Sequence, residues 1–143
     1  MGRRGVRIEW WGVLALLLGW MLGQQIAWGD EPDWARIEQV LMAEAASEGE
    51  LGMTWVACVM RERGGDLDAF SGHRRRDLEG FARRQPRHTV LAAHAAVQSA
   101  RRGFDCGGAS HFENVGAFGV PAWARGLTPV ATVGRHTFWR IRF

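Results

Sequence analysis

The sequence predicts a small α+β domain that is mainly helical and ends in a short β-element. Three apolar patterns with helical spacing come first, between residues 34 and 102, and one pattern with a period of two follows near the C-terminus. Helices followed by strands, without regular alternation, are typical of α+β domains. Once the first 29 residues are set aside, 114 residues remain. That length suffices for one domain and not for two.

The first 29 residues have the layout of a secretory signal peptide. Three arginines precede an apolar run at residues 10–22, and Ala27-Trp28-Gly29 offers small residues for cleavage before Asp30. This run is short for a transmembrane helix, which needs about 20 residues. A span counted over residues 8–28 keeps an uncleaved anchor open. We therefore expect an exported chain in the periplasm or cell envelope, touching a membrane only through this segment if it is retained.

The charge of the remaining chain, residues 30–143, argues against nucleic acid as a partner. This part contains 15 arginines, no lysine and 14 acidic residues, so its net charge is near +1. A nucleic-acid-binding domain normally carries a marked positive excess. The sequence leaves the oligomeric state open.

The two cysteines and the histidines give no metal signature. No His-x-x-x-His or Cys-x-x-Cys spacing occurs, so we expect neither a metal nor another cofactor. In an oxidising compartment Cys58 and Cys106 can form a disulfide. Cys58 lies in an apolar helical pattern, however, so a buried free thiol is an equal alternative.

Two helices are expected first, at residues 32–50 and 51–63. Asp30 or Asp33 can cap the first helix, and Gly64-Gly65 ends the second. The inward face of the first helix carries Trp34, Ile37, Leu41 and Glu44 at spacings of 3, 4 and 3. The inward stripe of the second helix is Leu51, Trp55, Val56, Val59 and Met60.

The rest of the chain is predicted to hold one more helix and a final strand. Residues 66–87 contain glycines, Pro86 and five arginines in one short run, which indicates a solvated surface segment with a helical turn near residues 78–81. Helix three is expected at residues 88–102. Its inward residues are Val90, Leu91, His94 and Val97. Within the closing segment, residues 130–143, the residues from Thr137 to Phe143 alternate with a period of two, which predicts a strand, with Gly134 at a turn or bulge before it.

Glu44 is the most informative residue, because it is an acid at the next position of an apolar stripe. A carboxylic acid beside apolar packing is desolvated, which favours its protonated form. A general acid that protonates a glycosidic oxygen near neutral pH needs this property. The alternative is that the helix frays after Ala43 and leaves Glu44 exposed.

Two blocks of the sequence resemble the SleB-type cell-wall hydrolases, the spore cortex-lytic enzymes and their relatives. "EAASEGELGMTWVACVMRER" at residues 44–63 is similar to the family's Glu-Ala-x-x-Glu-x-x-x-Gly stretch and the helix that follows it. "GFDCGGASHFEN" and "PAWARGLTPVATVGRHTFWR" resemble its Gly-Gly-Ala-x-x-Phe, Pro-x-Trp-Ala and Gly-x-His-x-Phe segments, in the same order. The chain departs from the family after residue 62, where the family's Gln-Phe-Ser stretch is poorly matched.

The resemblance implies a lysozyme-like or lytic-transglycosylase-like fold that cleaves peptidoglycan with one essential acid. By position that acid is Glu44. The partner would be the glycan strand, which needs hydrogen-bonding groups and aromatic faces, and residues 105–126 offer both. The candidate substrate-binding residues are Glu48, His111, Glu113, Asn114, Trp123 and His136.

Several of these residues also have a structural interpretation. His111 and Glu113 could pair to shape the loop, His136 could be a structural histidine, and Glu48 could be a solvated residue at a helix end. In a functional role, Glu48 would instead act on Glu44 as a like charge. Phe112 is expected in the core.

Three functions follow from the sequence as alternatives. With one reliable acid, a lytic transglycosylase is favoured. A hydrolytic muramidase needs a second carboxyl group, for which Glu48, Asp105 and Glu113 are candidates. A non-catalytic envelope module that binds peptidoglycan is the third. A cysteine peptidase built on Cys106 and His111 is disfavoured, since nothing suggests a residue to orient the histidine.

Overall fold

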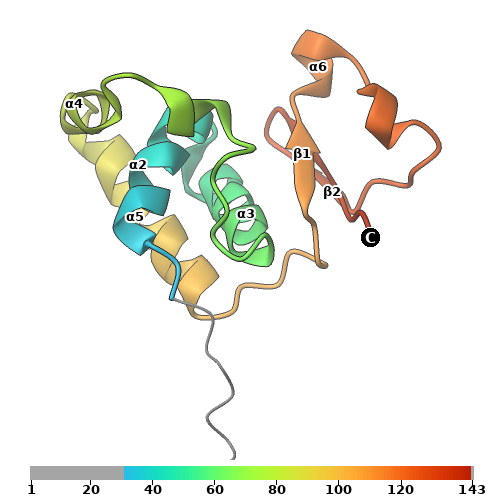
Figure 1. The fold of residues 1–143 in the computed structure, drawn as a ribbon, viewed down its shortest axis with the longest axis horizontal. Helices are drawn as coiled ribbons and strands as arrows, with labels where there is room; N and C mark the ends of the chain where they lie inside the picture. The colour runs from blue at the N-terminus through green and yellow to red at the C-terminus, as the bar shows by residue number, and fades with distance from the viewer. Residues whose placement is uncertain (1–30, 143) are drawn as a thin grey trace, which may run out of the picture. The chain divides into compact units, whose positions relative to one another are not determined.

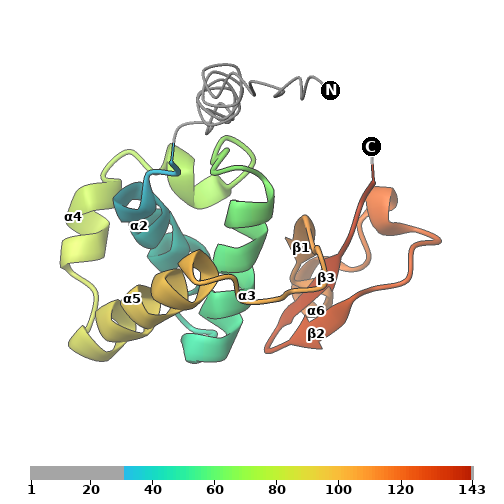
Figure 2. The ribbon, with the colours of Figure 1, turned by 90° about the horizontal axis from the view of Figure 1, so that it is seen from below.

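The structure, a computed structural model, describes residues 31–142, and it is a mixed domain in which helices precede a small antiparallel sheet. The helical part contains α2 (Trp34–Ala45), α3 (Gly49–Glu62), η1 (Ser71–Arg74), α4 (Leu78–Arg83) and α5 (Arg87–Arg101). The C-terminal part contains β1 (His111–Glu113), α6 (Val115–Phe118), η2 (Ala122–Ala124), β2 (Ala131–Val133) and β3 (His136–Trp139). In both views α3 lies between the other helices and the sheet (Figures 1 and 2). The predicted α+β class is confirmed, whereas the predicted signal peptide lies outside the described residues.

Helix α2 begins where the capping residue predicts. The carboxylate of Asp33 accepts a hydrogen bond from the backbone N–H of Arg36 at 2.9 Å. The helix ends at Ala45, five residues before the predicted end. Gly49, with φ of +69°, then starts α3 in a backbone conformation that favours glycine. Only a short turn therefore separates the end of α2 from the start of α3.

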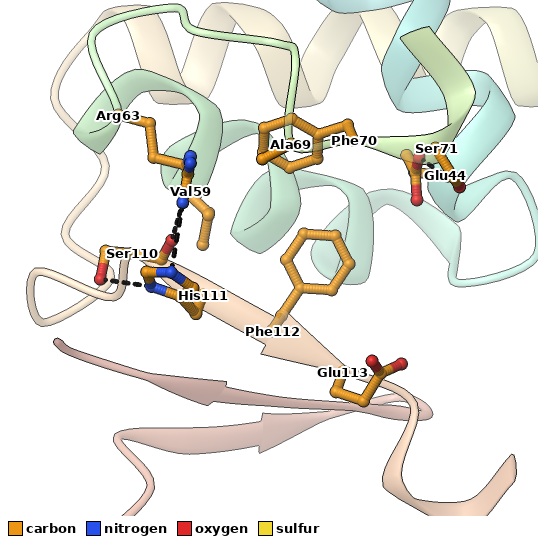
Figure 3. Close-up of a pocket in the computed structure, with 10 residues that line it drawn as sticks. All are labelled: Glu44, Val59, Arg63, Ala69, Phe70, Ser71, Ser110, His111, Phe112 and Glu113. Carbon is orange, nitrogen blue, oxygen red and sulfur yellow. Dashed lines mark hydrogen bonds between the residues drawn. The ribbon is translucent and has the colours of Figure 1, made fainter. Parts of the chain in front are cut away.

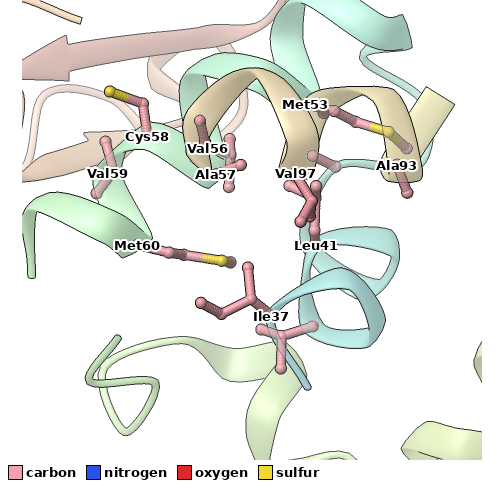
Figure 4. Packing of buried hydrophobic residues seen from close by; sticks show 14 of the residues in the cluster. Ile37, Leu41, Met53, Val56, Ala57, Cys58, Val59, Met60, Ala93 and Val97 are labelled. Carbon is pink, nitrogen blue, oxygen red and sulfur yellow. The ribbon is translucent and has the colours of Figure 1, made fainter. Parts of the chain in front are cut away.

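The core lies between α2, α3 and α5. Figure 4 shows Ile37 and Leu41 of α2 and Met60 of α3 directed into the same interior. On α5 the inward residues are mostly small: Ala93, Ala96, Val97 and Ala100. This alanine face lets the helices approach closely, so no bulky residue of α5 is needed inside.

Some residues predicted to face inward do not. Leu91 is 58 % exposed, and His94 lies on the surface, where its ring is 3.2 Å from the carboxylate of Glu38. Leu51 is 60 % exposed. In α3, most side chains between Met53 and Met60 are buried instead, because helices cover one side of α3 and the sheet covers the other.

The segment at residues 66–87 is more ordered than predicted. It holds η1 and α4, and Leu67, Phe70 and Leu78 are buried in the core. Asp77 caps α4 by accepting a hydrogen bond from the N–H of Gly80 at 3.1 Å. The arginines of this segment lie on the surface as expected, and α4 confirms the helical turn predicted near residues 78–81. The prediction of a solvated segment was wrong for the buried apolar residues between the arginines.

The sheet has the strand order β1-β3-β2, with both pairs antiparallel. Strands β2 and β3 form a hairpin with Gly134 in its turn. The predicted turn and final strand are confirmed, but β2 was not predicted, and β3 ends at Trp139, before the predicted end of the strand. Strand β1 was expected to be irregular, but it pairs with β3, opposing Phe112 to Phe138. Phe112 also contacts Phe70 at 6.0 Å between ring centroids, so it packs against the core.

A disulfide bond between Cys58 and Cys106 joins α3 to the segment that leads into β1. It settles the pairing that the sequence leaves open. The described residues from Pro32 onward form a compact unit that contains this disulfide and the whole core cluster. Within the described part of the chain, no helix has the length and apolar character to cross a bilayer.

A second link between helices and sheet is an ion pair at the start of α3. The backbone N–H and the Nε–H of Arg135 donate to the two oxygens of the Glu48 carboxylate, each at 2.8 Å. Burial raises the pKa of Glu48, but the hydrogen bonds and charge of Arg135 outweigh it and hold this pKa below its usual value. Gly134 lies so close that a Cβ there would be 2.2 Å from the Glu48 carboxylate.

Candidate functional site

Glu44 lies one residue before the end of α2, half-buried, and its carboxylate is held from one side. The hydroxyl of Ser71 donates to its Oε1 at 2.9 Å, and the backbone N–H of Gly72 donates to the same oxygen. No donor in residues 31–142 contacts its Oε2. The helix continues to Ala45, so the predicted alternative of a frayed, exposed glutamate does not occur. One oxygen is therefore fixed by the protein, and the other is left for a ligand.

Glu44 borders a cavity of about 250 Å³ whose other wall is the segment at residues 110–113 (Figure 3). The lining residues are Glu44, Val59, Arg63, Ala69, Phe70, Ser71, Ser110, His111, Phe112 and Glu113. The two sequence blocks that the resemblance singled out thus meet in space, although they are far apart in the sequence. The cavity has two aromatic rings on its wall and two carboxylates on opposite elements, Glu44 on α2 and Glu113 on β1.

His111 is fixed in one neutral form by its neighbours. The guanidinium of Arg63 lies 3.3 Å from Nε2, and because arginine can only donate, Nε2 accepts and Nδ1 carries the proton. Nδ1 then donates to the hydroxyl of Ser110 at 3.0 Å. Burial and, to a lesser extent, the charge of Arg63 lower the pKa of His111. Both nitrogens have protein partners, so a sugar hydroxyl would have to displace one of them or contact the ring face.

The hollow extends past Arg63. A second cavity, of about 380 Å³, is lined by Glu62, Arg63, Asp66, Ser110, His111 and Ile141. It shares Arg63, Ser110 and His111 with the first cavity. Two neighbouring cavities that share a wall suit an extended polymer better than a compact small molecule, which normally sits in a closed pocket.

Trp123 and His136 lie near the cavity without lining it. The ring of Trp123 is 5.2 Å from that of His111, and it also meets Trp139 edge-on at 5.2 Å. His136 is buried and meets Phe112 edge-on at 4.9 Å between centroids. Burial lowers the pKa of His136, with the charge of Glu48 opposing this effect. His136 therefore supports Phe112, which forms part of the cavity wall.

Three more candidates lie away from this cavity. Glu48 is engaged by Arg135, and Asn114 caps α6 by accepting from the N–H of Ala117 at 3.1 Å. Asn114 borders a separate hollow of about 450 Å³ next to the β2–β3 hairpin. Asp105 is exposed and accepts from the N–H of Gly107 at 2.7 Å. Of the candidate second acids, only Glu113 lines the cavity of Glu44.

The residues at this site that sequence reasoning missed are Ser71, Gly72 and Arg63. Ser71 and Gly72 belong to the segment interpreted as solvated surface. The sequence offered one signal, Phe70-Ser71, which resembles the end of the Gln-Phe-Ser stretch of the SleB-type hydrolases. Arg63 was noted only as part of the matched block. The sequence gives its spacing from Val59 but not its contact with Ser110 and His111.

The described residues contain one grouping with metal-binding side chains, Cys58, Glu62 and Cys106. The two sulfur atoms are joined in the disulfide, so they are not available as thiolate ligands. The grouping is therefore explained by the disulfide.

Replacing Gly72 by alanine is expected to lower any activity that depends on Glu44 by about 10- to 100-fold, the effect of losing one hydrogen bond to a charged group. A Cβ on Gly72 would lie 2.8 Å from the Cβ of Ala43 and 3.1 Å from Oε1 of Glu44, so the segment must move and its N–H is withdrawn. Gly116→Ala is the control, because its Cβ would meet only an ordinary contact at 3.7 Å. Rates of release from purified sacculi would measure the effect, and equal rates for both variants would contradict the role of this N–H.

Comparison with known proteins yields no match: no family model, no curated protein and no solved structure matches the chain.

Proposed function

We propose that the chain cleaves the glycan strands of peptidoglycan between N-acetylmuramic acid and N-acetylglucosamine, with Glu44 as the acid and base of a lytic transglycosylase. The observation that carries the proposal is the Glu44 carboxylate, fixed at Oε1 and facing a cavity with aromatic and polar walls. The resemblance to the SleB-type hydrolases independently implies that Glu44 is the essential acid. The open continuation of the cavity past Arg63 supports a polymeric substrate.

In this mechanism Glu44 donates its proton to the glycosidic oxygen as the bond from that oxygen to C1 of the muramic acid breaks. The C6 hydroxyl oxygen of the same sugar then bonds to C1, and its proton passes to the Glu44 carboxylate. The products are a 1,6-anhydromuramic end and a free N-acetylglucosamine end, and Glu44 is returned to its protonated form. Neither water nor a second carboxylate is consumed or required.

A hydrolytic muramidase is the second candidate, because Glu113 lines the same cavity from the opposite wall. Its carboxylate accepts a hydrogen bond from the N–H of Asn114 at 2.9 Å, which fixes its orientation. As a base for water, or as a nucleophile, Glu113 would supply the second carboxyl group that glycoside hydrolysis ordinarily uses.

The test is to digest purified sacculi with residues 30–143 and to identify the soluble muropeptides by mass spectrometry, for the wild type and for Glu113→Gln. We expect anhydro-muropeptides from both proteins, with little change in rate. Reducing ends from the wild type, abolished in Glu113→Gln, would establish the muramidase instead. If neither protein releases muropeptides while the wild type still co-sediments with sacculi, the chain is a binding module.

A further inference from the structure

The loop between β1 and β2 exposes apolar side chains that the fold does not use. Among the described residues, seven large apolar side chains are exposed, and five of them fall within residues 118–130. We call these five the loop patch: Phe118, Val120, Trp123, Leu127 and Val130, with exposures from 38 % to 78 %. Exposed apolar side chains gathered in one loop are a common mark of an interaction surface.

The loop patch lies on a part of the molecule that extends away from the helices. In both ribbon views η2 and the loop that follows it project on the side of the sheet opposite to α3, and α6 lies beyond the end of β1 in Figure 1 (Figures 1 and 2). The loop is nevertheless tied to the sheet. Trp123 packs on Trp139, and the N–H of Val130 donates to the carbonyl oxygen of Phe138 at 2.8 Å. The sheet thus holds the loop so that several apolar side chains face solvent.

The C-terminal part of the chain, which contains the loop patch, also carries an excess of positive charge. Residues 30–113 hold 11 arginines and 14 acidic residues, whereas residues 114–143 hold four arginines and no acidic residue. Arg135 is engaged by Glu48, but Arg125, Arg140 and Arg142 are exposed and have no ion-pair partner within residues 31–142. Cations on an apolar surface are the combination that binds the interface of an anionic bilayer.

We propose that the loop patch docks the domain on the surface of an anionic lipid bilayer, with Phe118, Trp123 and Leu127 entering the headgroup region and the arginines remaining among the headgroups. Contact between two copies through this face would bring their unpaired arginines together, which like charges oppose. A glycan strand offers no apolar phase for these side chains to enter, whereas an anionic bilayer accommodates both the apolar and the charged groups. This inference does not depend on the proposed function.

The experiment is co-sedimentation of residues 30–143, the part that carries its own core and disulfide, with vesicles of phosphatidylcholine alone or mixed with phosphatidylglycerol. We expect binding to the mixed vesicles that weakens with salt and little binding to phosphatidylcholine alone. Phe118→Ser with Leu127→Ser should lower the partition coefficient at least about tenfold. The matched control is Leu51→Ser with Leu91→Ser, which removes equally exposed leucines from the helical part.

Two double variants that each remove two arginines complete the experiment. Arg125→Gln with Arg142→Gln should weaken binding to anionic vesicles, and Arg87→Gln with Arg102→Gln, on α5 and its end, should not. Equal losses in patch and control variants, or no binding to anionic vesicles by a folded wild type, would overturn the proposal. So would a dimer that the Phe118 and Leu127 substitutions dissociate, because the patch would then bind a second copy.

Discussion

Glu44→Gln is expected to lower the release of soluble muropeptides from sacculi by about 10²- to 10⁴-fold, the range that a positioned acid and base contributes. The amide oxygen of glutamine can still accept the hydrogen bonds of Ser71 and Gly72, so the fold and the cavity are retained. What is lost is the proton that the leaving oxygen needs. The measurement is the initial rate of release, together with the thermal unfolding midpoint, which should not change.

The matched control is Glu50→Gln, which neutralises an exposed glutamate in the first turn of α3 at the same cost in net charge. It should retain the wild-type rate. A Glu44→Gln protein as active as Glu50→Gln would remove Glu44 from the reaction and shift attention to Glu113. Loss of release in Glu44→Gln with retained binding to sacculi would separate catalysis from recognition.

Reduction of the Cys58–Cys106 bond is expected to cost about 4 kcal/mol of the free energy of unfolding. The bond closes a loop across a sequence separation of 48 residues, and the chain-entropy model assigns an effect of about this size to such a loop. Domains of this kind are stable by only about 5–15 kcal/mol. Denaturant unfolding of the wild type with and without a thiol reductant measures the difference.

The control for this measurement is a variant with alanine at both cysteine positions, whose stability should not respond to the reductant. Alanine is a suitable replacement, because Cys58 and Cys106 are both buried and alanine adds no polar group to the interior. If reduced and oxidised wild type unfold at the same denaturant concentration, the disulfide contributes nothing to stability.

The parts of the fold that the sequence predicts well are those with strong local periodicity. The helices α2, α3 and α5 and the final strand β3 follow from spacing, from Asp33 and from the turn at Gly134. What spacing could not give is which side of a helix a neighbour covers. Leu91 fits the spacing of an inward face but is exposed, because α5 packs through a face made mostly of alanines.

The candidate site was predictable in its most important residue and not in its supporting ones. Glu44 breaks an apolar stripe, which is a local signal. Ser71 and Gly72 reach it through a change of chain direction within an arginine-rich segment, which no short-range pattern encodes. Strand β1 was missed for a similar reason: it has only three residues, and its pairing with β3 is a long-range contact.

The contact between Glu48 and Gly134 has a consequence for how the sequence can diverge. Position 134 has a left-handed backbone, with φ of +58°, and its space is filled by a carboxylate from 86 residues earlier in the chain. Any side chain at 134 collides with Glu48 as long as that glutamate is present. Among diverging homologues the two positions should therefore covary: asparagine, which tolerates this backbone, becomes acceptable at 134 only where 48 has become short.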